Sequence, residues 1–304
     1  MALPQTIDRL FDQFMKGCRA QSATPVRGGC ISRAWRVEAT DENGSEKSFF
    51  VKENDTDFLD NFQAEAAGLE ALAELADPII SLHVPKVHLV DLIADSAYLV
   101  LPWIESSSRS NDDEAYGRAL ASLHRAGRGK EIGFPRDNYL GASRQRNVVA
   151  NDEIPWAEFV AEYRLNQQLR TAVDAGRASA NLRRDAREVI DTLDDLLRGR
   201  HCETVLLHGD LWSGNVMTDS EARTVLIDPA VYRGCAEAEF GMIRLFGGVG
   251  ATFDHAYQTI YPLADGWQRR VEVYVLYHLL NHLNLFGGAY RTQCEESARK
   301  ILQA

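Results

Sequence analysis

Two short apolar segments in the C-terminal half of this chain end on polar residues at fixed intervals. The segment LLHGDLWSGNVM contains Asp210 and Asn215, and the later segment LIDPA places Asp228 thirteen residues after Asn215. Residues 205–207 have the pattern of a short buried strand, and residues 224–227 have that of a second strand ending just before Asp228. The pattern predicts a loop and a β-hairpin that carry these three polar side chains.

The order and spacing of the three residues are typical of sites that transfer a phosphoryl group. In the protein-kinase template, a loop Asp accepts the proton of the substrate hydroxyl, and an Asn five residues later holds one Mg²⁺. A further Asp, after a short strand, bridges the metal ions. The alternative is that HGD is an ordinary turn and Asp228 a cap, because Asp and Gly are common turn residues. The complete set at these intervals favours the phosphoryl-transfer site, with HGD in place of HRD.

A lysine and a glutamate near the N-terminus fit the same template. Residues 47–52, KSFFVK, predict a strand that ends on Lys52, and residues 57–76 predict a helix with an apolar stripe. Glu65 lies within this stripe, and a buried carboxylate needs a partner because an unpaired buried charge is costly. We expect Lys52 to be that partner, as in kinases, where the lysine contacts the phosphates. The alternative is a solvated lysine and a glutamate at the edge of a surface helix.

The apolar run AYLVLPWI predicts a strand that ends at a hinge between two lobes. An adenine ring bound at such a hinge forms hydrogen bonds with backbone atoms. Because Pro102 has no N–H, the expected contacts are the C=O of Leu101 and the N–H of Trp103. The predicted lobes are residues 1–104, rich in β-structure, and residues 105–304, mainly helical.

The larger lobe has mostly helical periodicity. Residues 271–286 predict a helix that is apolar nearly all round and therefore buried. His278, Asn281 and His282 share one sector of that helix. Buried polar groups need partners, so these residues form either a core network or a wall that faces a substrate. His124, at the border of an earlier apolar stripe, is expected to be a structural, hydrogen-bonded histidine.

Composition narrows the class of protein. The chain has 304 residues, 45% of them hydrophobic, which allows two modest domains or one large one. A formal net charge of -11 and a sequence pI of about 5.2 argue against nucleic acid or an anionic membrane surface as partner. No signal peptide or membrane-spanning apolar run is evident. Five irregularly spaced cysteines without a CxxC pair favour a reducing, cytoplasmic location.

Several longer motifs extend beyond the phosphoryl-transfer pattern. The most specific are HGDLWSGN from His208 and LYHLLNHLNLFGG from Leu276. The others are RGGCIS, FFVK, AEAAGLEAL, DNYLG, RLNQQL, DPAVY and LFGG. Through these motifs the chain resembles the fructosamine/ketosamine-3-kinase family over nearly its whole length.

The resemblance implies an α+β fold with the two lobes of a protein kinase, related to aminoglycoside phosphotransferases. It also implies transfer of phosphate from ATP, with Mg²⁺, to the 3-hydroxyl of a ketosamine. The 3-phosphate makes the adduct of amine and sugar labile, so the activity would be deglycation. The substrate would be a small ketosamine or a glycated protein.

Carried over by position, the resemblance assigns a role to each matched residue. Asp210 would be the proton acceptor, and Asn215 and Asp228 would be the Mg²⁺ ligands. Lys52 would contact the phosphates, with Glu65 as its anchor.

The remaining implied contacts involve the glycine loop and the substrate. Gly28, Gly29 and Cys30 would cover the phosphates, although this loop lacks a full GxGxxG. Trp212 would stack on or wall in the sugar, or else brace its own loop. His282 is a further substrate candidate.

One departure from the family pattern concerns the residue that props the catalytic loop. After DPAxYxG, family members usually carry an Asp that supports the loop from the following helix, whereas this chain has Glu239. The extra methylene is expected to loosen the loop.

Two other functions stay open on the sequence. One is a small-molecule kinase of the same fold that acts on an aminoglycoside, a choline-like compound or an amino alcohol. The other is a nucleotide-binding regulator without turnover. Either a monomer or a homodimer is expected.

Overall fold

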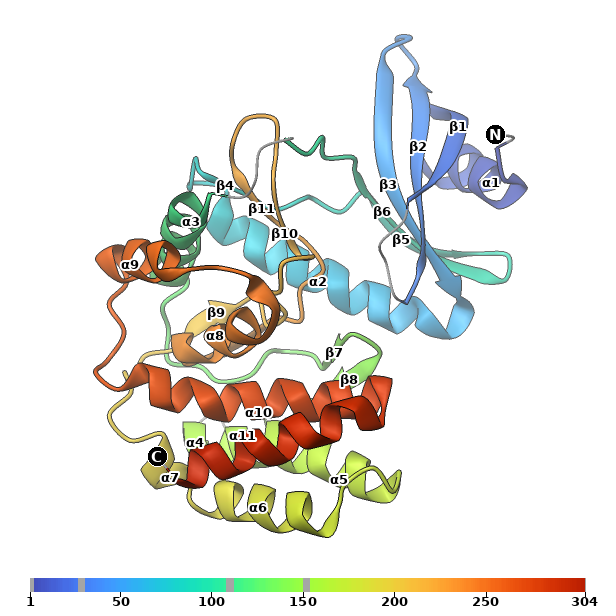
Figure 1. The fold of residues 1–304 in the computed structure, drawn as a ribbon. Coiled ribbons are helices and arrows are strands. Elements are labelled where there is room, and N and C mark those ends of the chain that lie inside the picture. The colour runs from blue at the N-terminus through green and yellow to red at the C-terminus, as the bar shows by residue number, and fades with distance from the viewer. Residues whose placement is uncertain (1–2, 27–30, 108–111, 150–153, 304) are drawn as a thin grey trace.

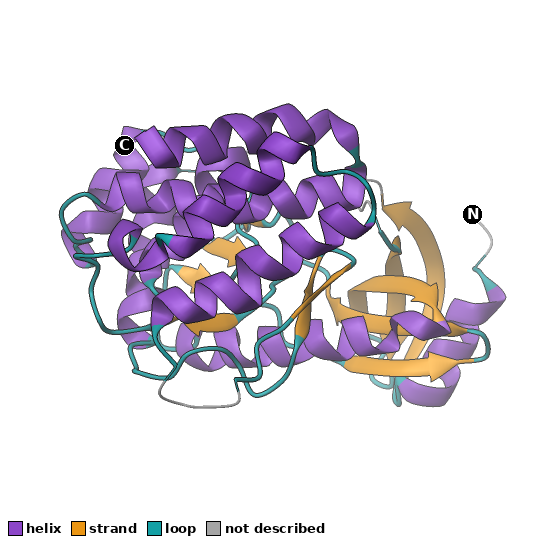
Figure 2. Ribbon diagram, turned by 90° about the horizontal axis from the view of Figure 1, so that it is seen from below, coloured by secondary structure: helices purple, strands orange, loops and turns teal. Residues whose placement is uncertain are grey.

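The computed structural model describes residues 3–26, 31–107, 112–149 and 154–303. Figure 1 shows a sheet-rich N-terminal part beside a larger helical C-terminal part, and Figure 2 shows the same division from below. This arrangement confirms the expected α+β class. Gly28, Gly29 and Cys30 lie outside the described residues.

A five-stranded antiparallel sheet forms the N-terminal part, in the order β1-β2-β3-β6-β5. The strands are β1 Cys18–Val26, β2 Arg33–Asp41, β3 Glu46–Asp55, β5 Leu89–Ile93 and β6 Ser96–Pro102. The strand expected at residues 47–52 is therefore part of β3. In the centre of the sheet, Lys52 of β3 pairs with Leu99 of β6.

Helix α1, Gln5–Phe14, packs against this sheet and was not expected from the sequence. Its buried residues Ile7, Leu10 and Phe11 join a small core with sheet residues such as Phe49. The rings of Phe11 and Phe49 meet edge to face with centroids 5.3 Å apart.

Helix α2, Leu59–Ala76, follows the 3-10 turn η1, Thr56–Phe58, and confirms the helix expected at residues 57–76. Its apolar stripe, including Phe62, Leu69 and Leu72, is buried. Figure 1 shows α2 running from beside the sheet to the helical part, where it meets β4, Leu82–His83.

Most helices belong to the C-terminal part. They are α3 Asp113–Ala126, α4 Trp156–Val160, α5 Asn166–Asp174, α6 Ala180–Asp191, α7 Leu193–Leu196, α8 Glu239–Met242, α9 Ala251–Ile260, α10 Trp267–Phe286 and α11 Arg291–Gln303. The π-helical turns η2 Ala161–Leu165 and η4 Ile243–Gly247 continue α4 and α8, and the 3-10 turns are η3 Ala236–Ala238 and η5 Gly288–Tyr290. The side chain of Asp112 caps α3 by accepting from two backbone N–H groups. In the described part of the chain, no helix has both the length and the apolarity to cross a membrane.

Short strands frame the loop that carries the HGD motif. They are β7 Asn138–Leu140, β8 Ser143–Gln145, β9 Val205–Leu207, β10 Val216–Thr218, β11 Thr224–Leu226 and β12 Tyr232–Gly234. Strand β9 pairs with β12, β10 pairs with β11, and β11 also pairs with β4 in parallel. Strands β9 and β11 match the two buried strands expected from the sequence.

Strand β6 belongs to two hydrophobic cores at once. Ala97, Leu99 and Leu101 lie in the main core, which includes α2 and the helical part. Tyr98 and Val100, between them, lie in the smaller core with α1 and the outer face of the sheet. The alternation follows from the two-residue period of a strand.

Candidate active site

The loop that follows β9 can be built only with glycine at its second position. Gly209 has a φ of +83°, and a Cβ placed there would lie 2.1 Å from the carbonyl oxygen of Ala230. The same two segments are joined by the N–H of Ala230, which donates to the carbonyl of His208 at 2.8 Å. The HGD turn is therefore packed directly against the chain that follows Asp228.

Asp210 and Asn215 face each other across this loop. The Asn215 Nδ2 group donates to the backbone oxygen of Asp210 at 2.8 Å and to its Oδ2 at 3.2 Å. Burial raises the pKa of Asp210 to about 7, and the negative charge of Asp228 adds to the rise, while the Asn215 hydrogen bond opposes it. The carboxyl group is thus poised to exchange a proton near neutral pH.

Asp228 follows β11 in a left-handed backbone conformation, with a φ of +56°. This region is uncommon for residues with a side chain, although Asp tolerates it better than most. The N–H of Ile227 donates to the Asn215 carbonyl at 3.1 Å, which ties the hairpin to the loop. The side chain of Asp228 is 41% exposed.

Lys52 connects the sheet to both α2 and the hairpin. Its Nζ lies 2.7 Å from Oε1 of Glu65 and 2.6 Å from Oδ1 of Asp228. The ion pair expected between Lys52 and Glu65 is confirmed. Burial alone would lower the pKa of Lys52, but the two carboxylates raise it above its usual value. Burial raises the pKa of Glu65 to about 7 against the opposing effect of Lys52.

Two further contacts hold α2 against the helical part. The carboxylate of Asp60, in the first turn of α2, accepts from Arg136 at 2.7 Å and from Tyr139 at 2.6 Å. Further along, Gly68 approaches Pro229 so closely that a Cβ would lie 3.2 Å from the proline ring. Both contacts keep the glutamate of α2 near the hairpin.

Glu239 supports the loop firmly, which corrects the expectation of a loosened loop. Its Oε2 accepts from the backbone N–H of His208 at 2.6 Å, and its Oε1 accepts from that of Gly209 at 3.0 Å. The residue is only 2% exposed. Glu239, at the start of α8, accommodates the extra methylene because its two carboxylate oxygens accept from two separate N–H groups of the loop.

The expected nucleotide contact at Trp103 also needs correction. Its backbone N–H donates to the carbonyl of Ser48 at 3.0 Å and extends the pairing of β6 with β3. Pro102 lies opposite Phe49, and Leu101 lies opposite Phe50, in the same register. The N–H of Trp103 is therefore engaged within the sheet and is not the free hinge donor that the sequence suggests.

Phe246 of η4 links the loop that carries Trp212 to His282. Trp212 is 37% exposed, and its ring lies over Gly214, where a Cβ would approach the ring to 2.3 Å. The N–H of Ser213 donates to the carbonyl of Phe246 at 3.1 Å. The ring of Phe246 lies 4.9 Å from that of His282. Sequence reasoning missed Phe246, whose only signal is its place in the LFGG motif.

His278 and Asn281 are both buried in the core, but only Asn281 joins a side-chain hydrogen-bond network, the first of the two alternatives; Nδ1 of His278 has no hydrogen-bond partner among the described residues. They are 3% and 1% exposed. Oδ1 of Asn281 accepts from Gln168 at 3.2 Å. Burial lowers the pKa of His278 to about 3, so the ring is neutral. His282 is partly exposed, and its Nδ1 lies 2.9 Å from the His278 carbonyl.

His124, on α3, is fully buried, and its Nδ1 lies 2.7 Å from the Tyr257 hydroxyl, as expected for a structural histidine.

The chemistry of Asn215 and Asp228 fits a magnesium ion. Mg²⁺ prefers oxygen ligands and usually combines one or two protein groups with substrate phosphates and water. The described residues hold no group of three His, Cys, Asp or Glu side chains that would form a complete protein cage. An amide oxygen and a partly exposed carboxylate on adjoining segments match the open type of site instead.

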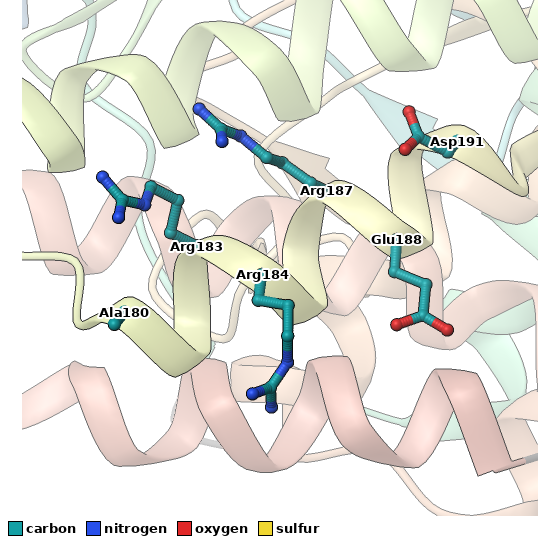
Figure 3. A pocket seen from close by; sticks show the side chains of 6 residues that line it. All are labelled: Ala180, Arg183, Arg184, Arg187, Glu188 and Asp191. Atoms are coloured by element: carbon teal, nitrogen blue, oxygen red, sulfur yellow. The ribbon is translucent and has the colours of Figure 1, made fainter.

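A further surface feature is a hollow on α6. Its volume is about 390 Å³, and its lining residues all lie on α6: Ala180, Arg183, Arg184, Arg187, Glu188 and Asp191. Figure 3 shows their charged side chains spread along the exposed helix. The hollow is a solvated helix face and contributes no residue to the loop or the hairpin.

A family model for fructosamine kinases matches residues 3–304. The chain belongs to the fructosamine kinase family. It is 38% identical over 287 residues to a probable ketoamine kinase of Synechocystis sp., covering 94% of this chain and 92% of the relative. It is also 38% identical over 269 residues to a chloroplastic protein-ribulosamine 3-kinase of Arabidopsis thaliana, covering 88% of this chain and 78% of the relative.

Solved structures agree with this family and with the fold. A candidate fructosamine-3-kinase from Thermobifida fusca superposes with a TM-score of 0.83 at 30% identity, over 100% of both chains. A thermostable mutant of an aminoglycoside phosphotransferase superposes with a TM-score of 0.59 at 14% identity, over 97% of both chains. The kinase-like fold implied by the sequence resemblance is confirmed.

Proposed function

We propose that this member of the fructosamine kinase family is an ATP-dependent phosphotransferase that acts on the 3-hydroxyl of ketosamines. The observation that carries the proposal is the contact of Lys52 with both Glu65 and Asp228, beside Asp210 and its partner Asn215. Such a set can align a hydroxyl and neutralise phosphate charge, which are the main demands of phosphoryl transfer. Relatives described as ketoamine kinases and ribulosamine 3-kinases supply the substrate class.

Each residue of the set has a defined task in this proposal. Asp210 accepts the proton of the substrate hydroxyl, and its raised pKa suits a base that works near neutral pH. Lys52 contacts the phosphates of ATP, and Glu65 fixes the lysine. Asn215 and Asp228 hold Mg²⁺, which when bound neutralises the charge that develops on the transferring group.

The substrate is proposed to bind beside Trp212 and His282. The nucleotide is proposed to bind beside Leu101, Pro102 and Trp103, without the N–H of Trp103 as a donor. The segment 101–104 then connects the two lobes. An ADP-bound aminoglycoside phosphotransferase of the same fold supports ATP use. A small ketosamine and a glycated lysine on a protein present the same reacting group, so both are substrates in this proposal.

Release of ADP tests the proposal directly. Purified protein with Mg-ATP would be offered fructosyl, ribulosyl and erythrulosyl amines, beside aminoglycosides and choline, with Asp210→Asn as control. We expect turnover on ketosamines, and loss of turnover with retained ATP binding in Asp210→Asn. Turnover only on the other alcohols would overturn the substrate class. ATP binding without any turnover would indicate a regulator.

A further inference from the structure

A buried chain of polar groups extends from the HGD loop to helices α3 and α9. Glu239 accepts from the N–H groups of His208 and Gly209, as described above. On its other side, Nε2 of His124 lies 3.5 Å from Oε2 of Glu239. His124 is 0% exposed. The carboxylate therefore lies between the catalytic loop and a histidine of α3, and Nε2 of that histidine has no hydrogen-bond partner among the described residues.

Tyr257 of α9 ends this chain of groups. Its hydroxyl lies 2.7 Å from Nδ1 of His124. Burial raises the pKa of Tyr257 well above its usual value, so the phenol keeps its proton. A neutral imidazole has one N–H and one acceptor nitrogen, and the hydrogen bond at one nitrogen decides which is which. A phenol that donates to Nδ1 places the ring proton on Nε2, the nitrogen that faces Glu239.

We propose that Tyr257 and His124 are positioning residues for Asp210, because they keep an N–H directed at the carboxylate that holds the catalytic loop. The proposal rests on the role of Asp210 in the proposed function. With the other tautomer, the lone pair of Nε2 would face the Glu239 carboxylate in a buried site. That repulsion would displace the carboxylate from the two N–H groups, and the HGD turn with it.

The expected kinetic effect is selective. The chain of groups reaches the loop through His208 and Gly209, whereas the proposed phosphate contact, Lys52, is held by Glu65 and Asp228. Loss of the Tyr257 hydroxyl should therefore impair the transfer step and leave ATP binding nearly intact. A general loss of stability would instead impair both the transfer step and ATP binding.

The structure offers a matched control for Tyr257→Phe. Tyr274, on α10, is also buried, and its hydroxyl accepts from Nε1 of Trp156 at 2.8 Å. It packs against Gly241 of the helix that begins with Glu239, yet its hydroxyl is not part of the polar chain. Tyr274→Phe removes an equivalent buried hydroxyl without changing the partner of His124.

The test combines kinetics with nitrogen NMR of His124. We expect Tyr257→Phe to lower kcat about tenfold with the KM for ATP changed by less than about twofold, from the size of one buried hydrogen bond. Tyr274→Phe should keep the parent kcat. In the parent protein, the His124 nitrogen shifts should indicate a protonated Nε2 and an unprotonated Nδ1. His124→Gln, which can still donate toward Glu239, should retain more activity than His124→Leu.

Equal kcat values for the two tyrosine variants would overturn the inference, as would a His124 ring with a protonated Nδ1. Failure of the proposed function would give a different experimental result. In that case the parent protein itself has no turnover on the substrate panel, and the NMR measurement still decides whether Tyr257 sets the tautomer.

Discussion

The ammonium of Lys52 lies 2.6 Å from the carboxylate of Asp228, although 176 residues separate them in the chain. Glu65 completes the contact from α2 at 2.7 Å. A β-strand, a helix and a hairpin therefore meet at one positive charge. The arrangement makes Lys52 one of the points at which the sheet-rich and helical parts are joined electrostatically.

Replacement of this lysine should disable the site more than it disturbs the fold. Lys52→Met leaves the Glu65 and Asp228 carboxylates without their shared cation and removes the proposed phosphate contact. We expect kcat/KM for ATP to fall by about a hundredfold or more, as for loss of a preorganised charge in an active site. Lys47→Met is the matched control, since Lys47 lies on the same strand with its side chain 53% exposed. Equal activity in both variants would contradict the assignment.

The close approach of Gly209 to the Ala230 carbonyl predicts different effects of alanine substitution at two glycines with positive φ. Gly209→Ala places a Cβ against the Ala230 carbonyl, so the HGD turn must move, and we expect kcat to fall at least about a hundredfold. Gly176 also has a positive φ, +66°, but a Cβ there meets no atom within 4 Å. Gly176→Ala should cost only backbone strain, about 1 kcal/mol in the free energy of unfolding, with unchanged kcat. Steady-state kinetics and chemical denaturation of both variants measure these outcomes.

Shortening the side chain of Glu239, which supports the loop, should be harmful in this chain. In Glu239→Asp the carboxylate no longer reaches both N–H groups, and a buried donor loses its acceptor. We expect a loss of about 1–3 kcal/mol in stability together with a lower kcat. Glu237→Asp is the control, because Glu237 is equally buried but pairs with Arg270 at 2.6 Å, away from the loop. A similar kcat in the two variants would refute the link between Glu239 and the loop.

Acid should destabilise the protein through His278. Its pKa is about 3 in the folded state against an ordinary value of 6.5, because burial disfavours the charged ring. The unfolded chain therefore binds this proton between these pH values, and stability present above pH 6.5 is lost as the pH falls. The contribution of one such group is at most about 1.4 kcal/mol per pH unit. Denaturation of the parent and of His278→Gln between pH 6.5 and 5 should differ in slope by up to this amount, and identical slopes would exclude the effect.

Local patterns in the sequence predicted most of the site. The apolar runs around Asp210 and Asp228 specified two strands and the loop between them, and the stripe of α2 placed Glu65 on a buried face. Lys52 then followed as its partner, since a buried carboxylate needs one. These inferences depend on periodicity and on the cost of burial, both of which act within a single element.

The features that sequence reasoning missed depend on contacts between distant backbone atoms. The N–H of Trp103 is taken by Ser48 because β6 continues its pairing beyond Pro102. Glu239 holds the loop because its two oxygens match two N–H groups some thirty residues away. Neither geometry follows from residue types alone. Helix α1 was missed because its amphipathic pattern is short and lies next to the strand signals.

The division of the β6 side chains between two hydrophobic cores has a mechanical consequence. Tyr98 and Leu99 are neighbours in the chain, yet their side chains enter different hydrophobic cores. Because the β6 side chains that pack with α1 do not enter the core that contains α2, we expect fraying at the N-terminus to have little effect on the position of Glu65. A substitution at Tyr98 should therefore affect mainly the packing on the outer face of the sheet. A substitution at Leu99 should affect mainly the packing of the main core.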